Sequence, residues 1–170
     1  MNNVLRVAIA SLLVLSVAAC AKKTTTKAPV DSQQAPVVQT SPADNSGCYT
    51  RDSLDSDSCL RQRVVYFDFD RNEIRPEFQA QIACHAEYLR QFPDARVTLE
   101  GNTDERGSRE YNLGLGERRG NAVQSAVSAA GASFNQLNVV SYGEERPVCK
   151  EHDDSCWSKN RRVEIIYTAK

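Results

Sequence analysis

The sequence lacks the features that most enzymes and nucleic-acid-binding proteins need. Its 170 residues include only two histidines, His85 and His152, and no serine or cysteine has a plausible base partner besides the neighbours Cys84 and His85. Adjacent residues on a helix point about 100° apart, so these two side chains do not face each other. We expect His85 to lie at the surface or its boundary. We therefore predict no catalytic residues and no enzymatic activity.

The charges of the chain are nearly balanced. There are 21 basic and 22 acidic residues, which give a formal net charge of −1. A surface that binds a polyanion needs an excess of positive charge. We therefore do not expect nucleic acid as a partner.

No apolar run in the sequence reaches the roughly 20 residues that span a bilayer, but a shorter run lies near the N-terminus. A polar start with one positive charge, residues 1–6, precedes an apolar stretch at 7–17 and then Ala18, Ala19 and Cys20. This order is typical of a signal peptide. We interpret residues 1–19 in this way rather than as a buried core helix, because nothing polar interrupts one face.

The residues before Cys20 resemble the bacterial lipobox, although Val17 stands where leucine is more common. The resemblance implies that Cys20 becomes the first mature residue and carries acyl chains such as palmitate, which suffice for stable membrane anchoring. In lipoproteins that the sequence resembles here, a residue such as Ala21 in place of aspartate favours sorting to the outer membrane, so the resemblance implies an outer-membrane protein that faces the periplasm. The alternative is a secreted soluble protein with a disulfide at Cys20.

Residues 20–47 are rich in Lys, Thr, Ser, Gln, Ala and Pro, with almost no large apolar side chains. Such a segment cannot bury enough surface to offset its ordering entropy, so we predict a flexible tether. Residues 48–170 suit one domain with a single core at about 63–168.

Five cysteines remain in that domain, and an exported chain encounters an oxidising compartment. Proximity in the sequence favours the disulfides Cys48–Cys59 and Cys149–Cys156, although four cysteines allow three connectivities. Cys84 lies among apolar helical positions and is predicted to be a free, buried thiol. A zinc site is the alternative interpretation of these cysteines, but neither pair has the Cys-x-x-Cys spacing of a structural zinc site. We expect no metal and no cofactor.

The hydrophobic periodicity predicts an α/β domain. Strands and helices follow in the order β-α-β-α-β-β, with the helices on one face of a mixed sheet. Pro76 is placed to begin the first helix, and Ser108 and Gly131 are placed to cap the second at its two ends. The predicted elements span 64–69, 76–92, 96–101, 108–130, 137–142 and 162–168.

One charged residue interrupts this pattern. Arg119 falls in the middle of the apolar stripe of the second helix, which is formed by Leu115, Ala122, Val123, Ala126, Val127 and Ala130. A guanidinium that points toward the core needs an anionic partner. Either Arg119 belongs to a ligand site, or it reaches solvent or pairs with a structural carboxylate.

The loop that precedes this helix offers the partner groups. Thr103 supplies a hydroxyl and Asp104 a carboxylate, directly after the second strand. Asp70 follows the first strand and shares this end of the sheet if the first two strands are parallel. Loops at the carboxyl ends of strands commonly form ligand sites in α/β folds. An arginine beside a carboxylate suits a zwitterionic amino-acid centre.

Six motifs follow one another between residues 63 and 167. They are Tyr66-Phe67-Asp68-Phe69-Asp70, Glu100-Gly101-Asn102-Thr103-Asp104-Glu105-Arg106-Gly107, Glu110-Tyr111-Asn112, Leu115-Gly116-Glu117-Arg118-Arg119, Val140-Ser141-Tyr142-Gly143 and Ser158-Lys159-Asn160-Arg161-Arg162-Val163. Together they resemble the OmpA-like peptidoglycan-binding domain family, and the lipobox and tether resemble the layout of its peptidoglycan-associated lipoproteins. The family often has histidine at the position of Asn102, and Cys84, Cys149 and Cys156 depart from its pattern.

The resemblance implies roles for particular residues. Asp104 and Arg119 would hold the ammonium and carboxylate of diaminopimelate in the peptidoglycan stem peptide, with Asp70 at the pocket edge. Thr103 and Asn112 would lie close by. The pair Arg161-Arg162 is typical of the family, but the sequence does not indicate which of the two faces the ligand.

The resemblance also implies a cellular role. It implies an outer-membrane lipoprotein that links the membrane to peptidoglycan non-covalently within the Tol-Pal system, supports envelope integrity and cell division, and binds TolB and other Tol proteins. Two alternatives are a cell-wall amidase or transpeptidase, which would need a zinc triad or an activated nucleophile, and a lipoprotein that interacts only with proteins. Binding to purified sacculi separates the last alternative from the first interpretation.

Overall fold

The computed structural model describes residues 48–169 of the chain. The predicted signal peptide, the predicted acylation site Cys20 and the whole predicted tether, residues 20–47, lie outside these residues. Within the described part, no helix has the length and apolar character needed to cross a membrane.

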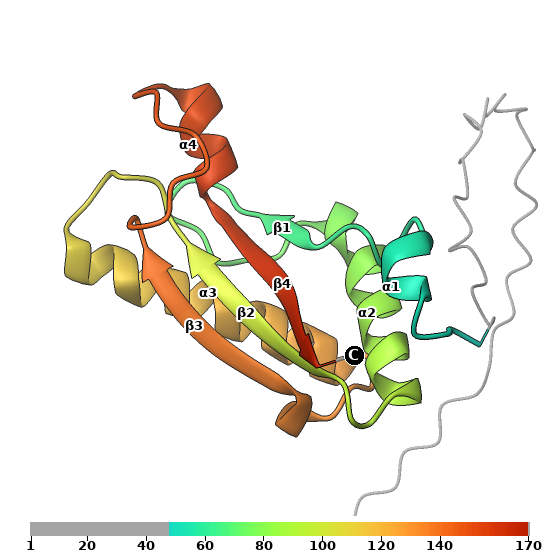
Figure 1. Ribbon diagram of the computed structural model, residues 1–170. Helices are drawn as coiled ribbons and strands as arrows, with labels where there is room; N and C mark the ends of the chain where they lie inside the picture. The colour runs from blue at the N-terminus through green and yellow to red at the C-terminus, as the bar shows by residue number, and fades with distance from the viewer. Residues whose placement is uncertain (1–47, 170) are drawn as a thin grey trace, which may run out of the picture. The chain divides into compact units, whose positions relative to one another are not determined.

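Four strands form one mixed sheet (Figure 1). They are β1 (Val64–Tyr66), β2 (Arg96–Asn102), β3 (Leu137–Gly143) and β4 (Arg162–Ala169), in the spatial order β1-β4-β2-β3. Strand β4 is antiparallel to β1 and β2, while β3 is parallel to β2. Strands β1 and β2 therefore run in the same direction, and their carboxyl ends reach the same edge of the sheet.

The two main helices lie on one face of this sheet (Figure 1), which confirms the predicted fold class. A 3-10 turn, η1 (Pro76–Phe78), leads into α2 (Gln79–Gln91), and α3 (Arg109–Ala129) follows β2. The Ser108 hydroxyl accepts a hydrogen bond from the Tyr111 amide at 3.2 Å and so caps the start of α3. Gly131, with φ +112°, follows its last turn. The core between helices and sheet is formed mainly by aliphatic side chains, among them Val65, Ile82, Leu89, Val97, Leu99, Val123, Val127, Val163 and Ile165.

Glycines bring the first half of α3 unusually close to the sheet. A Cβ atom built on Gly101 of β2 would lie 2.0 Å from the carbonyl oxygen of Gly116, which no real side chain can do. A Cβ on Gly116 would lie 2.3 Å from Ser141 Oγ on β3. The close backbone approach fixes the start of α3 against the ends of β2 and β3.

Three short elements were not predicted. They are α1 (Ser53–Ser56), a second 3-10 turn η2 (Phe134–Gln136) and α4 (Asp154–Asn160). Each is too short to show the repeated apolar spacing on which a helix prediction depends. The last of them, α4, lies between β3 and β4 and is capped by Asp153, whose carboxylate accepts a hydrogen bond from the Cys156 amide at 2.9 Å.

One of the two predicted disulfides is correct. The bridge Cys149–Cys156 is present, but Cys59 pairs with Cys84 of α2 and Cys48 is free and exposed. The predictions of a Cys48–Cys59 bridge and of a free, buried Cys84 are therefore wrong. Proximity in the sequence failed because the chain after α1 passes alongside α2, which brings Cys59 within a Cα–Cα distance of 6.3 Å of Cys84.

The prediction that His85 lies at the surface or its boundary is also wrong, because its side chain is completely buried. Its Nδ1 is 2.9 Å from the Tyr167 hydroxyl and its Nε2 is 2.9 Å from the Gln62 carbonyl oxygen. A carbonyl can only accept, so Nε2 carries the proton and Nδ1 accepts from the tyrosine. Burial lowers the pKa of His85 from its ordinary 6.5 to about 4, and the ring is neutral in the folded protein at neutral pH.

Candidate functional site

A cavity of about 210 Å³ opens at the edge of the sheet where β1 and β2 end. The loop after β1, the loop 103–108 and the first three turns of α3 enclose it. All five residues predicted to bind ligand lie in its wall. The lining residues are Phe69, Asp70, Thr103, Asp104, Arg106, Gly107, Tyr111, Asn112, Leu115 and Arg119.

Arg119 lies on the sheet-facing side of α3 and is completely buried. Its Nε, Nη1 and Nη2 donate to the carbonyl oxygens of Arg71, Asn102 and Asp68 at 2.8, 2.9 and 3.0 Å. The expectation of an anionic side chain bonded to Arg119 is thus wrong for the described residues, since backbone carbonyls take that place. Burial, followed by repulsion from Arg161, lowers its pKa to about 10, so the group stays charged at neutral pH.

These contacts leave part of the guanidinium free for a ligand. An arginine carries five N–H donors, and the three hydrogen bonds engage three of them. One N–H remains on each terminal nitrogen. A pair of N–H groups of this kind matches the two oxygens of a carboxylate.

Asp104 is only 2% exposed and interacts with two other arginines. Its Oδ2 accepts from Arg106 Nη2 at 2.7 Å and from Arg161 Nη1 at 3.0 Å, and its Oδ1 accepts from the amide and the Nε of Arg106 at 3.1 and 3.2 Å. Burial acts to raise the pKa of Asp104, but these hydrogen bonds outweigh it and lower the pKa below its ordinary value. The carboxylate is therefore charged at neutral pH.

Asp70 reaches the cavity from the other side. Its backbone adopts φ +55°, a left-handed conformation that aspartate tolerates better than most residues. Its Oδ1 accepts a hydrogen bond from the Tyr111 hydroxyl of α3, while its Oδ2 has no partner among the described residues. Both side chains are exposed, so this bond crosses the mouth of the cavity at the surface.

Two neutral polar side chains complete the predicted set. Thr103 is 3% exposed, and its hydroxyl is buried without a hydrogen-bond partner among the described residues. Asn112 is 1% exposed and donates through Nδ2 to Glu144. A buried hydroxyl without a partner costs free energy unless something else bonds to it. Thr103 therefore has unused hydrogen-bonding capacity at the cavity.

Arg106 belongs to the site and was missed as a site residue. Its guanidinium lies 3.9 Å from the ring centroid of Phe69 and 4.2 Å from that of Trp157. Arg106 belongs to one of the motifs quoted above, but its spacing did not indicate that its side chain bonds to Asp104.

The structure also distinguishes the roles of Arg161 and Arg162. Arg161 bonds to Asp104, whereas Arg162 is directed to Glu164 and to the carbonyls of Asn160 and Arg146.

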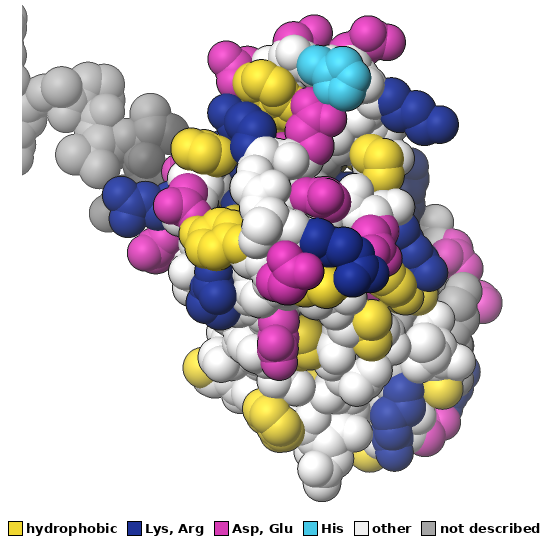
Figure 2. All heavy atoms as spheres, turned by 90° about the vertical axis from the view of Figure 1, so that its left-hand side faces the viewer, with side chains coloured by type: hydrophobic (Ala, Val, Ile, Leu, Met, Phe, Trp, Pro, Cys, Tyr) yellow, Lys and Arg dark blue, Asp and Glu magenta, His cyan; other side chains and the backbone are white. Residues whose placement is uncertain are grey.

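The face at which α3 begins carries acidic and basic side chains intermixed, without a patch of one sign (Figure 2). Within the cavity and its immediate surroundings, three arginines (106, 119 and 161) meet two carboxylates (Asp70 and Asp104). Within residues 48–169, no group of three or more His, Cys, Asp or Glu side chains could hold a metal ion. Charged and hydrogen-bonding side chains make up most of the cavity wall.

Comparison with known proteins places this architecture in a family. The sequence model of the OmpA family matches residues 66–161. The chain is 48% identical over 114 residues to a peptidoglycan-associated lipoprotein of Pseudomonas putida, covering 66% of this chain and 68% of the relative. It is 46% identical over 107 residues to the protein of the same name from Pasteurella multocida, covering 63% and 71%.

Solved structures give the same result. The crystal structure of the peptidoglycan-associated lipoprotein from Burkholderia pseudomallei has a TM-score of 0.66 and 43% sequence identity, covering 68% of this chain and 98% of that one. The C-terminal domain of Helicobacter pylori MotB shares the fold, with a TM-score of 0.58 and 23% identity over 63% of this chain and 84% of that one. The chain belongs to the OmpA family, and its relatives within that family include the peptidoglycan-associated lipoproteins.

Proposed function

We propose that this protein binds peptidoglycan non-covalently by holding the zwitterionic end of diaminopimelate in the stem peptide. The observation that carries the proposal is a fully buried, charged Arg119 in the wall of a cavity that also contains Asp70 and Asp104. The names of the relatives, which describe association with peptidoglycan, support peptidoglycan as the ligand. The protein is a binding protein and not an enzyme.

The carboxylate of the ligand is assigned to Arg119. The two N–H donors that the backbone carbonyls leave unused can bond to it as a pair. Because the guanidinium has no exposed surface, a ligand must first displace a neighbouring side chain. Tyr111 and Asp70 are suited to move, since both are exposed and one hydrogen bond joins them across the cavity.

The ammonium of the ligand is assigned to Asp70, with Asp104 acting through its charge. Both oxygens of Asp104 already accept two hydrogen bonds each, so an ammonium there would replace an arginine. Asp70 Oδ2 has no such competitor. The hydroxyl of Thr103 and the amide of Asn112 provide neutral hydrogen-bonding groups beside the two charges.

In this proposal, a lipid anchor on the protein lets peptidoglycan binding connect the membrane to the cell wall. In this proposal acylated Cys20 holds the protein in the outer membrane, facing the periplasm, and residues 20–47 let the domain reach the cell wall. The link would serve envelope integrity and cell division within the Tol-Pal system. TolB and other Tol proteins are the proposed protein partners, by resemblance to the family.

Co-sedimentation with purified sacculi of the diaminopimelate type tests the proposal. The purified protein should pellet with sacculi, and Asp70→Asn should remain in the supernatant because it removes the negative charge offered to the ammonium. Asp94→Asn is the matched control, since Asp94 pairs with Arg51 at the exposed surface away from the cavity. A wild-type protein that fails to pellet would favour a lipoprotein that interacts only with proteins.

A further inference from the structure

The α4 segment, residues 148–160, lies between β3 and β4 and packs beside the loop that precedes α3. Trp157 of this segment donates through Nε1 to Glu105 at 2.8 Å, and His152 Nδ1 lies 2.7 Å from the same carboxylate. Glu105 is the neighbour of both Asp104 and Arg106 in the loop before α3. The α4 segment thus contacts the loop that carries the pocket carboxylate.

Arg106 lies against two aromatic rings. Its guanidinium lies 3.9 Å from the ring centroid of Phe69 and 4.2 Å from that of Trp157, both well within the range of cation–π attraction. In this position it bonds to both oxygens of Asp104. Phe69 lies in the wall of the cavity, whereas Trp157 lies outside it. Trp157 is therefore connected to the ligand site through Arg106 and through Glu105, the neighbour of Asp104.

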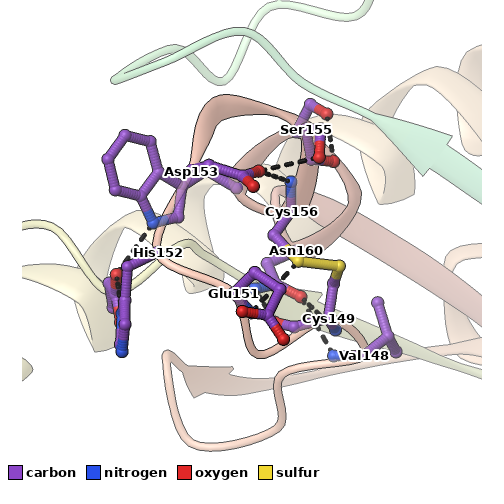
Figure 3. Close-up of a disulfide and its surroundings, with 11 residues drawn as sticks. Val148, Cys149, Glu151, His152, Asp153, Ser155, Cys156 and Asn160 are labelled. Atoms are coloured by element: carbon purple, nitrogen blue, oxygen red, sulfur yellow. Dashed lines mark hydrogen bonds and ion pairs between the residues drawn. A yellow bond between two sulfur atoms is a disulfide. The ribbon is translucent and has the colours of Figure 1, made fainter.

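A disulfide and a set of local hydrogen bonds fix the α4 segment (Figure 3). Cys149 and Cys156 are bonded to each other, and Asn160 receives hydrogen bonds from the amides of Val148 and Cys149 at 2.9 and 3.1 Å. Asn160 also donates to the Cys149 carbonyl at 2.7 Å. A helix of seven residues has little stability of its own. The bridge is therefore the main covalent restraint on where Trp157 lies.

We propose that the Cys149–Cys156 disulfide and Trp157 act as positioning elements for ligand binding, because together they hold Arg106 against Asp104. The inference rests on the proposed function, since it concerns the same cavity. Neither the disulfide nor Trp157 touches the ligand. Without them Arg106 is free to leave Asp104, and the charged wall of the cavity loses its fixed geometry.

Three variants test this inference in the full-length protein purified in detergent. Trp157→Ala and the double variant Cys149→Ser/Cys156→Ser should each weaken binding of a diaminopimelate stem peptide, measured by calorimetry, by about tenfold, the size expected for one cation–π contact that is partly shielded from water. Trp157→Phe retains an aromatic ring over Arg106 and should restore most of the affinity. The matched control is Cys59→Ser/Cys84→Ser, which removes a disulfide whose two cysteines do not line the cavity.

A second measurement does not depend on the ligand. Arg106 lowers the pKa of Asp104 through its hydrogen bonds, so release of Arg106 should raise that pKa toward its ordinary value. A carboxyl-carbon NMR titration should show this rise in Trp157→Ala and in the Cys149/Cys156 variant, but not in the Cys59/Cys84 variant.

The outcomes separate the two proposals. Unchanged affinity and an unchanged Asp104 pKa in the first two variants would overturn the inference while leaving the proposed function intact. Equal losses in the Cys59/Cys84 control would also overturn it, because the effect would then be general destabilisation. If the wild type binds no stem peptide, the proposed function fails, and the Asp104 titration still decides whether the disulfide and Trp157 position Arg106.

Discussion

Arg119 should stabilise the fold as well as form part of the ligand site, and this can be tested without any ligand. Its side chain joins the loop after β1, at the carbonyls of Asp68 and Arg71, to the end of β2 at Asn102. Replacement by alanine removes all three hydrogen bonds, although the Asp68 carbonyl oxygen still accepts one from the Arg71 amide at 3.3 Å. The cavity beside them can admit water, which limits the loss.

The expected loss of stability is the difference between the hydrogen bonds that are lost and the cost of charge burial that is relieved. Hydrogen bonds to a charged group contribute about 1.5–3 kcal/mol each, so three of them suggest roughly 4–9 kcal/mol before any compensation. Removal of the arginine also removes the penalty for burying its charge, which is several kcal/mol. We expect Arg119→Ala to lower the free energy of unfolding by about 3 kcal/mol, the scale seen when buried polar networks are broken.

Urea denaturation of the purified protein measures this loss. Arg118→Ala is the matched control, because Arg118 is the exposed neighbour on the same helix and such surface changes usually stay within about 0.5 kcal/mol. Equal stability of the two variants would refute the reasoning, since Arg119 would then not hold the two loops together. The expected loss also means that Arg119 variants weaken ligand binding for two reasons, so a change of ligand is a cleaner test of the site.

Three further predictions follow from other parts of the molecule. The pKa of buried His85 is about 4 when folded and 6.5 ordinarily, so the unfolded chain binds more protons between these values. Stability should therefore fall by about 3 kcal/mol as pH drops from 6.5 to 4, and thermal unfolding of His85→Gln should show a flatter dependence on pH. Gly101→Ala should destabilise the protein by at least about 2 kcal/mol, because its Cβ would overlap the Gly116 carbonyl; a thermal midpoint equal to that of the wild type would contradict the close helix–sheet contact. Cys20→Ser should move the protein out of the membrane fraction, and palmitate labelling that persists in this variant would refute acylation at Cys20.

Most of the fold could be predicted from the sequence because its long elements have clear periodic patterns. The strands rich in β-branched residues and the helix between Ser108 and Gly131 were located within a few residues of their observed ends. Arg119 was identified because a charge within an apolar stripe conflicts with its surroundings. Asp70, Thr103 and Asp104 were expected at one end of the sheet because they follow two strands that run in the same direction, and the structure places them there.

The predictions for His85, for one disulfide and for the partners of Arg119 were wrong for different reasons. For His85, the polarity of the side chain was given more weight than its position. His85 has the same helical spacing from Ile82 and Leu89 as a core residue, and this spacing should have indicated burial despite its polarity. The Cys59–Cys84 bridge depends on how the segment after α1 lies against α2, which no local pattern encodes. The partners of Arg119 are backbone carbonyls, and their direction follows only from the folded loops.

The central claim is that the cavity selects a zwitterionic centre, and calorimetric titration of the purified wild-type protein with two stem peptides tests it most directly. A peptide with diaminopimelate offers both a carboxylate and an ammonium, whereas one with lysine offers the amine alone and leaves Arg119 without its ligand partner. An unmatched member of a buried charged pair typically costs about 2–5 kcal/mol. We therefore predict a preference for the diaminopimelate peptide of at least about 30-fold. Equal affinity for the two peptides would mean that Arg119 only stabilises the fold, and would contradict the proposed site.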